Sequence, residues 1–204
     1  MVITSAEKQK NNEMIRIFIN NTYAFSMPEE EFLRMHLYER KELSEDEICN
    51  IREEINVRLA KQRSIRLLTF RDRSECELKE NLKKQGFDND VADEAVLQLK
   101  AMGYVNDRLY AHKFISDRLK LKPKSKKALF YELQKKGIDT NLINEVLEDF
   151  ELDESLFAFR IAKKKYGKYN ANDPQIQRKI VSYLFHRGFT YDIISDVLKQ
   201  MAEQ

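Results

Sequence analysis

The sequence of 204 residues has only two cysteines and three prolines, and it lacks any long apolar run. Cys49 and Cys76 are too few for a disulfide framework and do not have the spacing of metal ligands, so we expect free thiols. No run approaches the roughly 20 apolar residues that a membrane span needs, and the first residues lack the apolar core of a secretory signal. These absences predict a cytoplasmic protein that does not cross a membrane.

Signals of catalysis are equally scarce. The three histidines, His36, His112 and His186, lie far apart in the sequence and have no partners at the spacing of metal ligands. The phosphate-binding pattern G-x-x-x-x-G-K is absent. Acidic pairs such as Asp93-Glu94 occur, but 34% of the residues are charged, so such pairs are expected on solvated helix faces. The sequence therefore predicts no catalytic residues, no metal site and no cofactor.

A repeat with a period of 51 residues is the strongest pattern that the chain does contain. Gly86, Gly137 and Gly188 mark it, and an apolar residue follows each glycine. The same period relates three further sets of residues: Leu82, Leu133 and Leu184; Ala60, Ala111 and Ala162; and the potential helix caps Asp88, Asp139 and Thr190. We interpret each period as three helices, of which the second ends at the glycine and the third follows the cap. Such periods are typical of stacked units that serve as binding surfaces.

The third helix of each predicted unit carries an apolar stripe at helical spacing. All of its positions are apolar: Val91, Ala92, Ala95, Val96 and Leu99; Leu142, Ile143, Val146, Leu147 and Phe150; Ile193, Ile194, Val197, Leu198 and Met201. Signals for helix starts agree, because Ser74 and Glu77 have the spacing of a capping box and Asp173 precedes Pro174. The loop before Pro174, residues 167–173, is longer than its counterparts, and we expect it to be the most flexible part of the array.

The first 27 residues have a different pattern. Ile15, Ile17 and Ile19 alternate with other residues, which predicts two or three short strands. Pro28 then suits the first position of a helix, and Ser44-x-x-Glu47 is a capping box for the next helix. The predicted fold class is mostly α, a tandem array of three three-helix repeats with a small N-terminal β-hairpin or sheet and helix. The expected segments are 1–54, 55–103, 104–152 and 153–204.

Charge is distributed unevenly along the chain. Residues 1–55 contain 7 basic and 12 acidic side chains, whereas residues 56–204 contain 29 and 22. Each predicted unit has one basic stretch without an acid, at 55–71, 118–131 and 155–172, and stacked units would align these stretches into a track that attracts phosphates or an acidic protein groove. The candidate partner-binding and nucleic-acid-binding residues are Arg58, Arg63, Arg66, Lys120, Lys122, Lys124, Lys126, Lys127, Lys163, Lys164, Lys165, Lys168 and Tyr166. Tyr166 and the nearby Tyr169 offer rings for base stacking.

The glycine turn also suits a helix-turn-helix that reads DNA, but charge disfavours this interpretation. The third helix would enter the groove, and it carries acids in every unit: Asp88, Asp90, Asp93 and Glu94; Asp139, Glu145, Glu148 and Asp149; Asp192 and Asp196. These carboxylates would repel the phosphates of DNA. A partner that presents charges of both signs, such as a protein filament on nucleic acid, is the better match.

Four motifs together resemble the RecX family of bacterial recombination regulators. They are Arg71-x-Arg73-Ser74-x-x-Glu77-Leu78, Leu82-x-x-x-Gly86-Phe87, Gly103-Tyr104-Val105-Asn106-Asp107 and Leu133-x-x-Lys136-Gly137-Ile138. The likeness covers residues 55–201, and Gln85 departs from the basic residue that the family more often has there. The resemblance implies an array that docks in the groove of the RecA filament on single-stranded DNA. It further implies that the protein limits filament growth, ATP hydrolysis and strand exchange, and so acts in homologous recombination, DNA repair and the SOS response.

Two other classes of function stay open. A non-specific DNA-binding protein would bind single-stranded or duplex DNA without RecA, with an affinity that falls steeply with salt. A protein scaffold would have negligible affinity for DNA. Replacing Lys124, Lys126 and Lys127, which we expect in a loop after Pro123, with glutamate would separate these classes. In each case we expect a monomer.

Overall fold

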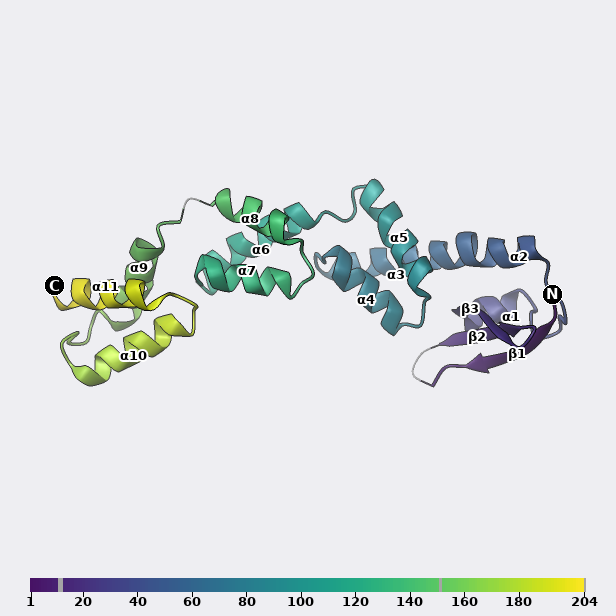
Figure 1. Ribbon diagram of the computed structural model, residues 1–204, viewed down its shortest axis with the longest axis horizontal. Coiled ribbons are helices and arrows are strands. Elements are labelled where there is room, and N and C mark those ends of the chain that lie inside the picture. Colours follow the sequence, from purple (N-terminus) through teal and green to yellow (C-terminus); the bar gives the residue numbers. More distant parts are fainter. Residues whose placement is uncertain (11–12, 151, 204) are drawn as a thin grey trace. The chain divides into compact units, whose positions relative to one another are not determined.

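The computed structural model describes residues 1–10, 13–150 and 152–203, without the side chain of Glu54. These residues form two compact units, an N-terminal unit (Met1–Asn106) and a C-terminal unit (Asp107–Gln204). The fold is mostly helical, with a single three-stranded sheet among the described residues at the N-terminal end (Figure 1). The structure thus confirms the predicted fold class.

The sheet consists of β1 (Ile3–Lys8), β2 (Met14–Ile19) and β3 (Thr22–Pro28), which pair antiparallel in that order. The turn between β2 and β3 is made by Asn20 and Asn21, both at positive φ, as a tight hairpin with right-handed strand twist requires. The alternating isoleucines of β2 are buried, as their spacing predicted. They pack with Phe25, Met27 and residues of the following segment into one core.

A short helix, α1 (Glu29–Arg34), follows the sheet. Pro28 is its N-cap residue, one residue before the first helical position that the sequence predicted for it. The next helical run consists of α2 (Glu45–Asn50), a π-helical segment η1 (Ile51–Asn56) and α3 (Val57–Phe70) without a loop between them. The predicted capping box of α2 is present with both of its hydrogen bonds.

The helical run changes its packing partner along its length. Ile48, Ile51 and Ile55 pack against the core of the sheet. Val57 and Ala60 instead belong to the core of the helices that follow. A π-helical turn holds more residues than an α-helical turn, so η1 rotates the apolar face at the point where the packing partner changes.

Three repeats of three helices make up the rest of the chain (Figure 1). Repeat 1 consists of α3, α4 (Glu75–Lys84) and α5 (Asn89–Ala101). Repeat 2 consists of α6 (Asp107–Leu121), α7 (Lys126–Gln134) and α8 (Thr140–Glu148), and repeat 3 of α9 (Glu154–Tyr166), α10 (Pro174–Phe185) and α11 (Tyr191–Ala202).

The periodic residues occupy equivalent places in the three repeats. The repeat alanines of the first helices and leucines of the second helices are fully buried, and every residue of the predicted apolar stripes is buried or half-buried. Gly86, Gly137 and Gly188 have φ values of 92°, 73° and 85° just after the second helix. L-residues with a side chain rarely adopt this conformation, which explains the glycine at this point of the period.

The connections between helices differ in one repeat. The loop between α9 and α10 is longer than the loops that end at Ser74 and Ser125, as predicted. Ala171 of this loop is buried in the core of repeat 3, and its carbonyl accepts a hydrogen bond from the Gln177 side chain. The flexibility of the loop stays a prediction.

The proposed segment boundaries also stay predictions. The boundary after residue 54 falls inside η1, in a continuous helical run. Those after residues 103 and 152 fall between α5 and α6 and between α8 and α9.

The sheet is attached to repeat 1 by polar side chains. The Asn56 amide donates to the Ser26 carbonyl at 2.7 Å. Asp88 accepts from the Tyr23 hydroxyl and, at 3.2 Å, from the Ser26 amide. Asp88 does stand at the cap of α5, but its side chain forms no cap hydrogen bond and binds β3 instead, which corrects the role that we predicted for it.

Repeats 2 and 3 meet through hydrogen bonds between the start of α7, the turn after α10 and the start of α9. The Ser125 amide donates to the Arg187 carbonyl at 3.0 Å, and its hydroxyl donates to the Gly188 carbonyl at 2.7 Å. The Lys126 amide donates to the Glu154 carboxylate at 2.6 Å. A Cβ on Gly188 would lie 2.7 Å from the Cβ of Ala128, so this close approach depends on glycine.

Candidate partner-binding surfaces

The predicted basic residues of repeat 1 are accessible. Arg58, Arg63 and Arg66 project from α3, and all three are exposed. Arg63 and Arg66 line a hollow of about 390 Å³ together with Phe70, whose side chain is 77% exposed. No carboxylate of the described residues forms an ion pair with these three arginines. Glu13 also lines this hollow, so this part of α3 presents an excess of positive charge beside one carboxylate and an apolar ring.

The basic stretch of repeat 2 is partly neutralised. The Arg118 guanidinium donates to Glu132 at 2.9 Å, and Lys124 pairs with the same carboxylate. Burial alone would raise the pKa of Glu132, but the hydrogen bond from Lys124 and the charges of both cations outweigh it and hold this pKa below its ordinary value. Glu132 is thus ionised at neutral pH and offsets a charge that the sequence presented as free.

The lysines near Pro123 also differ from one another in secondary structure and in exposure. Lys122 and Lys124 lie in the loop, but Lys126 and Lys127 form the first turn of α7, which corrects the predicted loop position of both. Lys126 is half-buried. The fully exposed members of the predicted set in this repeat are Lys120, Lys122 and Lys127.

The basic residues of repeat 3 project from the end of α9. Lys163, Lys164, Lys165 and Lys168 are exposed. Tyr166 is half-buried, and its ring centroid lies 5.6 Å from that of Tyr183 in an edge-on contact. This ring is part of the packing of repeat 3, so it does not offer the open stacking face that we predicted.

Sequence reasoning missed a second group of cations in repeat 3. Arg178 and Lys179 of α10 and Arg187 of the following turn surround a hollow of about 440 Å³, with Lys165 on its other side. A signal for them was present, because residues 174–191 contain no acid at all. This second acid-free stretch lies on the second helix of the repeat, outside the basic stretches of the first helices.

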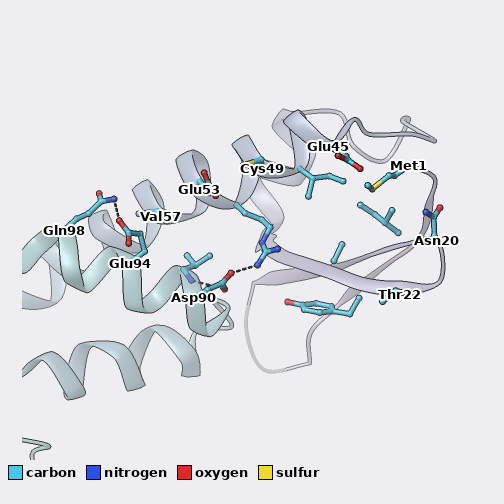
Figure 2. Close-up of a pocket in the computed structure, with 16 residues that line it drawn as sticks. Met1, Asn20, Thr22, Glu45, Cys49, Glu53, Val57, Asp90, Glu94 and Gln98 are labelled. Atoms are coloured by element: carbon cyan, nitrogen blue, oxygen red, sulfur yellow. Dashed lines mark hydrogen bonds and ion pairs between the residues drawn. The ribbon is translucent and has the colours of Figure 1, made fainter.

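An acidic pocket of about 970 Å³ lies in the N-terminal unit, between the sheet and the helices α2 and α5 (Figure 2). Glu45, Glu53, Asp90 and Glu94 line it, and Arg52 pairs with Asp90. Cys49 also faces this pocket. A hydrogen bond to Glu53, with burial and nearby carboxylates, raises the pKa of the Cys49 thiol, which disfavours the reactive thiolate.

Two further searches give no additional site within the described part of the chain. No group of three or more histidine, cysteine or acidic side chains is arranged to hold a metal ion in residues 1–10, 13–150 and 152–203. Over the same residues, no helix combines the length and the apolar content that crossing a membrane requires.

These features define the class of the molecule, a helical-repeat protein with separate basic and acidic surfaces. Models of three RecX domains match it in order: the first three-helix domain at residues 60–99, the second at 106–147 and the third at 158–198. The chain belongs to the RecX family.

Named relatives agree with this assignment. Regulatory protein RecX of Bacillus velezensis is 33% identical over 198 residues, which cover 95% of this chain and 74% of the relative. Regulatory protein RecX of Clostridioides difficile is 30% identical over 203 residues, which cover 98% and 95% of the two chains. These names support a regulatory role for the chain.

Solved structures support the fold. A crystal structure of regulatory protein RecX has a TM-score of 0.64 and 21% identity, over 97% of this chain and 98% of the other. A crystal structure of RecX from Lactobacillus salivarius has a TM-score of 0.63 and 23% identity, over 73% of this chain and 98% of the other.

Proposed function

We propose that the chain regulates a RecA recombinase by binding in the groove of the RecA filament on single-stranded DNA. Binding limits the ATPase activity, strand exchange and growth of the filament. Family membership supports a regulatory role, and one structural observation supports a polyanionic or mixed-charge partner. The first helices of repeats 1 and 3, and the turn that follows the latter, carry exposed cations that form no ion pair with a described carboxylate: Arg58, Arg63, Arg66, Lys164, Lys165 and Lys168.

The surfaces of the N-terminal unit suit a partner of both signs. Arg63 and Arg66 line one hollow, whereas Glu53 and Glu94 line the acidic pocket. A filament of protein on nucleic acid presents both phosphates and charged side chains, so each surface can meet a complementary one. The acidic pocket itself would not bind phosphates, so it is left for the basic side chains of such a partner.

Inhibition follows if different repeats bind different protomers. The two basic surfaces belong to repeats that lie far apart in the chain, and linked sites bind cooperatively when their spacing matches that of the partner. Bridged protomers keep one relative orientation, so a hydrolysis or exchange cycle that needs protomer rotation slows down. Subunits that can no longer leave or join at a bridged position also limit filament growth.

The test is a titration of the DNA-stimulated ATPase of RecA with this protein. We expect a decrease in ATPase rate at or below one molecule per RecA protomer. The double variant Arg63→Gln, Arg66→Gln should need several-fold more protein for the same decrease. The matched control Lys83→Gln, Lys84→Gln removes the same charge from exposed positions on α4 and should act as the unmodified chain does. An unchanged ATPase rate at equimolar protein contradicts the proposal.

The scaffold and DNA-binding alternatives give different results in the same assays. A scaffold without DNA contact tolerates loss of Arg63 and Arg66 and does not bind an oligonucleotide. A non-specific DNA binder reduces the ATPase rate only by competing for DNA, so added DNA abolishes the effect. Regulation by binding to the filament instead persists when DNA is in excess over this protein.

A further inference from the structure

A hollow in repeat 3 has the composition of an anion-binding site. Its volume is about 440 Å³, and it lies between the end of α9 and one face of α10. The residues that line it include four cations, two aromatic rings and no acid: Lys165, Tyr166, Arg178, Lys179, Ser182, Tyr183, His186 and Arg187. We propose that this hollow binds a phosphate group of single-stranded nucleic acid, with a neighbouring base on the ring of Tyr169.

The four cations are not compensated by the protein. Within the described residues, Lys165, Arg178, Lys179 and Arg187 form no ion pair with a carboxylate. The contrast with repeat 2 is direct, because Glu132 there neutralises Arg118 and Lys124. Like charges that converge on one hollow repel each other, and an anion in the hollow removes this repulsion.

Two of the cations are held in place by a ring. The Nζ of Lys165 lies 4.3 Å from the ring centroid of Tyr183, and the guanidinium carbon of Arg187 lies 3.9 Å from the same centroid. Tyr183 is fixed in turn by its edge-on contact with Tyr166. Cation–π contacts of this kind restrict the side chains, so less conformational entropy is lost when a ligand binds.

Arg187 carries a further signal of a ligand. Its backbone carbonyl is bound by Ser125, which ties the residue to repeat 2. Its buried Nε has no hydrogen-bond partner in the protein. A buried donor without a partner is costly, and a guanidinium is suited to bidentate contact with phosphate oxygens. The Arg187 guanidinium and the three other cations therefore favour a ligand with several anionic oxygens.

The surroundings of the hollow favour nucleic acid over an acidic peptide. The ring of Tyr169 is 58% exposed, and its centroid lies 6.4 Å from that of Tyr166 in the wall of the hollow. Tyr183 already carries Lys165 and Arg187, so Tyr169 is the ring that remains available for a base. Stacking requires an unpaired base, which duplex DNA does not offer. An acidic peptide would use the cations but not this ring.

This site goes beyond the proposed action on RecA and is tested without it. The probe is a fluorescein-labelled oligothymidylate, and its anisotropy is measured with the full chain at several salt concentrations. The variant Arg178→Gln, Lys179→Gln should weaken binding about 10-fold and reduce the magnitude of the salt slope by about 1, since about 0.7 counterions are released per single-strand phosphate. The control Lys83→Gln, Lys84→Gln should change the affinity less than 2-fold.

A second variant tests the base. Tyr169→Ala should weaken binding of the oligothymidylate about 5-fold or more, because stacking is lost, but should leave binding of inorganic polyphosphate unchanged. Circular dichroism checks that both variants keep the helical content of the unmodified chain. Equal DNA affinities for the hollow variant and the control overturn the proposal, as does an unchanged affinity of Tyr169→Ala.

The remaining outcomes are equally decisive. If polyglutamate displaces the oligonucleotide at equal charge and Tyr169→Ala has no effect, the site is one for acidic peptides and the nucleic-acid proposal is wrong. If the unmodified chain lowers the RecA ATPase rate but does not bind the oligonucleotide, this inference fails while the proposed function stands. If it binds the oligonucleotide through the hollow but leaves the ATPase rate unchanged, the reverse holds.

Discussion

The two compact units hold their parts together in different ways. In the N-terminal unit, the carboxylate of Asp88 and the amide of Asn56 bind backbone and side-chain groups of β3. In the C-terminal unit, repeats 2 and 3 approach so closely that Ser125 binds the carbonyls of Arg187 and Gly188. The first junction is made by polar side chains that bind β3, whereas the second requires a residue without a side chain, Gly188, at its closest approach.

Equivalent positions of the repeat can therefore form different interactions. Asp88 and Asp139 occupy the same position in the period, at the cap of the third helix. Asp139 accepts hydrogen bonds from the first turn of α8, whereas Asp88 binds the sheet. Helix α5 begins without a bond from its N-cap side chain, so the neighbouring sheet decides which bond this aspartate forms.

The largest expected effect concerns the glycine at the junction of repeats 2 and 3. Gly188→Ala places a Cβ 2.7 Å from both Ala128 and the Ser125 hydroxyl, at a φ of 85°. We expect a loss of about 3 kcal/mol in the free energy of unfolding, from overpacking added to backbone strain. Urea unfolding followed by circular dichroism measures it.

Gly103→Ala is the matched control, because Gly103 has a similar φ of 80° but no atom within 4 Å of the added Cβ. Backbone strain alone should cost about 1 kcal/mol. Equal losses for the two variants would mean that repeats 2 and 3 do not meet as closely in solution.

The next effect concerns the two caps. Asp88→Ala removes the acceptor of Tyr23 and Ser26 and should cost about 2 kcal/mol, whereas Asp139→Ala should cost about 1 kcal/mol through loss of a helix cap. Hydrogen exchange distinguishes them further. Amides of β3 should exchange faster in Asp88→Ala and remain protected in Asp139→Ala. Equal protection of β3 in both variants would show that Asp88 does not attach the sheet.

A smaller effect is expected inside repeat 2. Glu132→Gln leaves Arg118 and Lys124 without their carboxylate and should cost about 1 kcal/mol at neutral pH, since solvent screens part of the interaction. The folded-state pKa of Glu132 is lowered, so its contribution is present above the unfolded pKa and is lost as pH falls through the folded pKa. Chemical unfolding at pH 7 and at pH 3 should therefore show a larger difference from the unmodified chain at pH 7 than at pH 3.

The same variant makes repeat 2 more like repeat 3 in charge. Its retention on a heparin column should increase, because two cations become available to a polyanion. Unchanged retention would indicate that Glu132 does not limit the exposed charge of this repeat.

The smallest effect is a titration at the sheet junction. Burial, followed by the hydrogen bond to Asp88, raises the pKa of Tyr23 to about 12. The neutral phenol is favoured in the folded state, so its stabilising contribution is complete below about pH 10 and is lost as pH rises through about 12. Tyr23→Phe should reduce the loss of stability between these values, and a pH profile that matches the unmodified chain would contradict this assignment.

The period predicted most of the fold because it follows from local chemistry. The repeat glycines, the buried alanines and the apolar stripes depend on helix geometry alone, and the structure has them where the sequence indicated. The contacts between elements could not be predicted in this way. Lys124 pairs with Glu132 because its side chain extends from the loop along α7, and Tyr166 faces inward because α9 and α10 pack together.

The candidate surfaces show the same limit. The stretch without acids correctly predicted the exposed arginines of α3, because no carboxylate lies near them on the same helix. It also predicted a free charge at Lys124, where the compensating carboxylate lies outside the stretch. The hollow in repeat 3 is formed by two helices, so its four cations form one site only when α9 and α10 pack together.

The π-helical segment η1 has a mechanical consequence for the basic surface of repeat 1. The helices α2, η1 and α3 are continuous from Glu45 to Phe70, without a loop between them. One end of this helical run packs against the core of the sheet and the other end against the core of repeat 1. The orientation of the sheet therefore also sets the orientation of α3 and the directions in which Arg63 and Arg66 point.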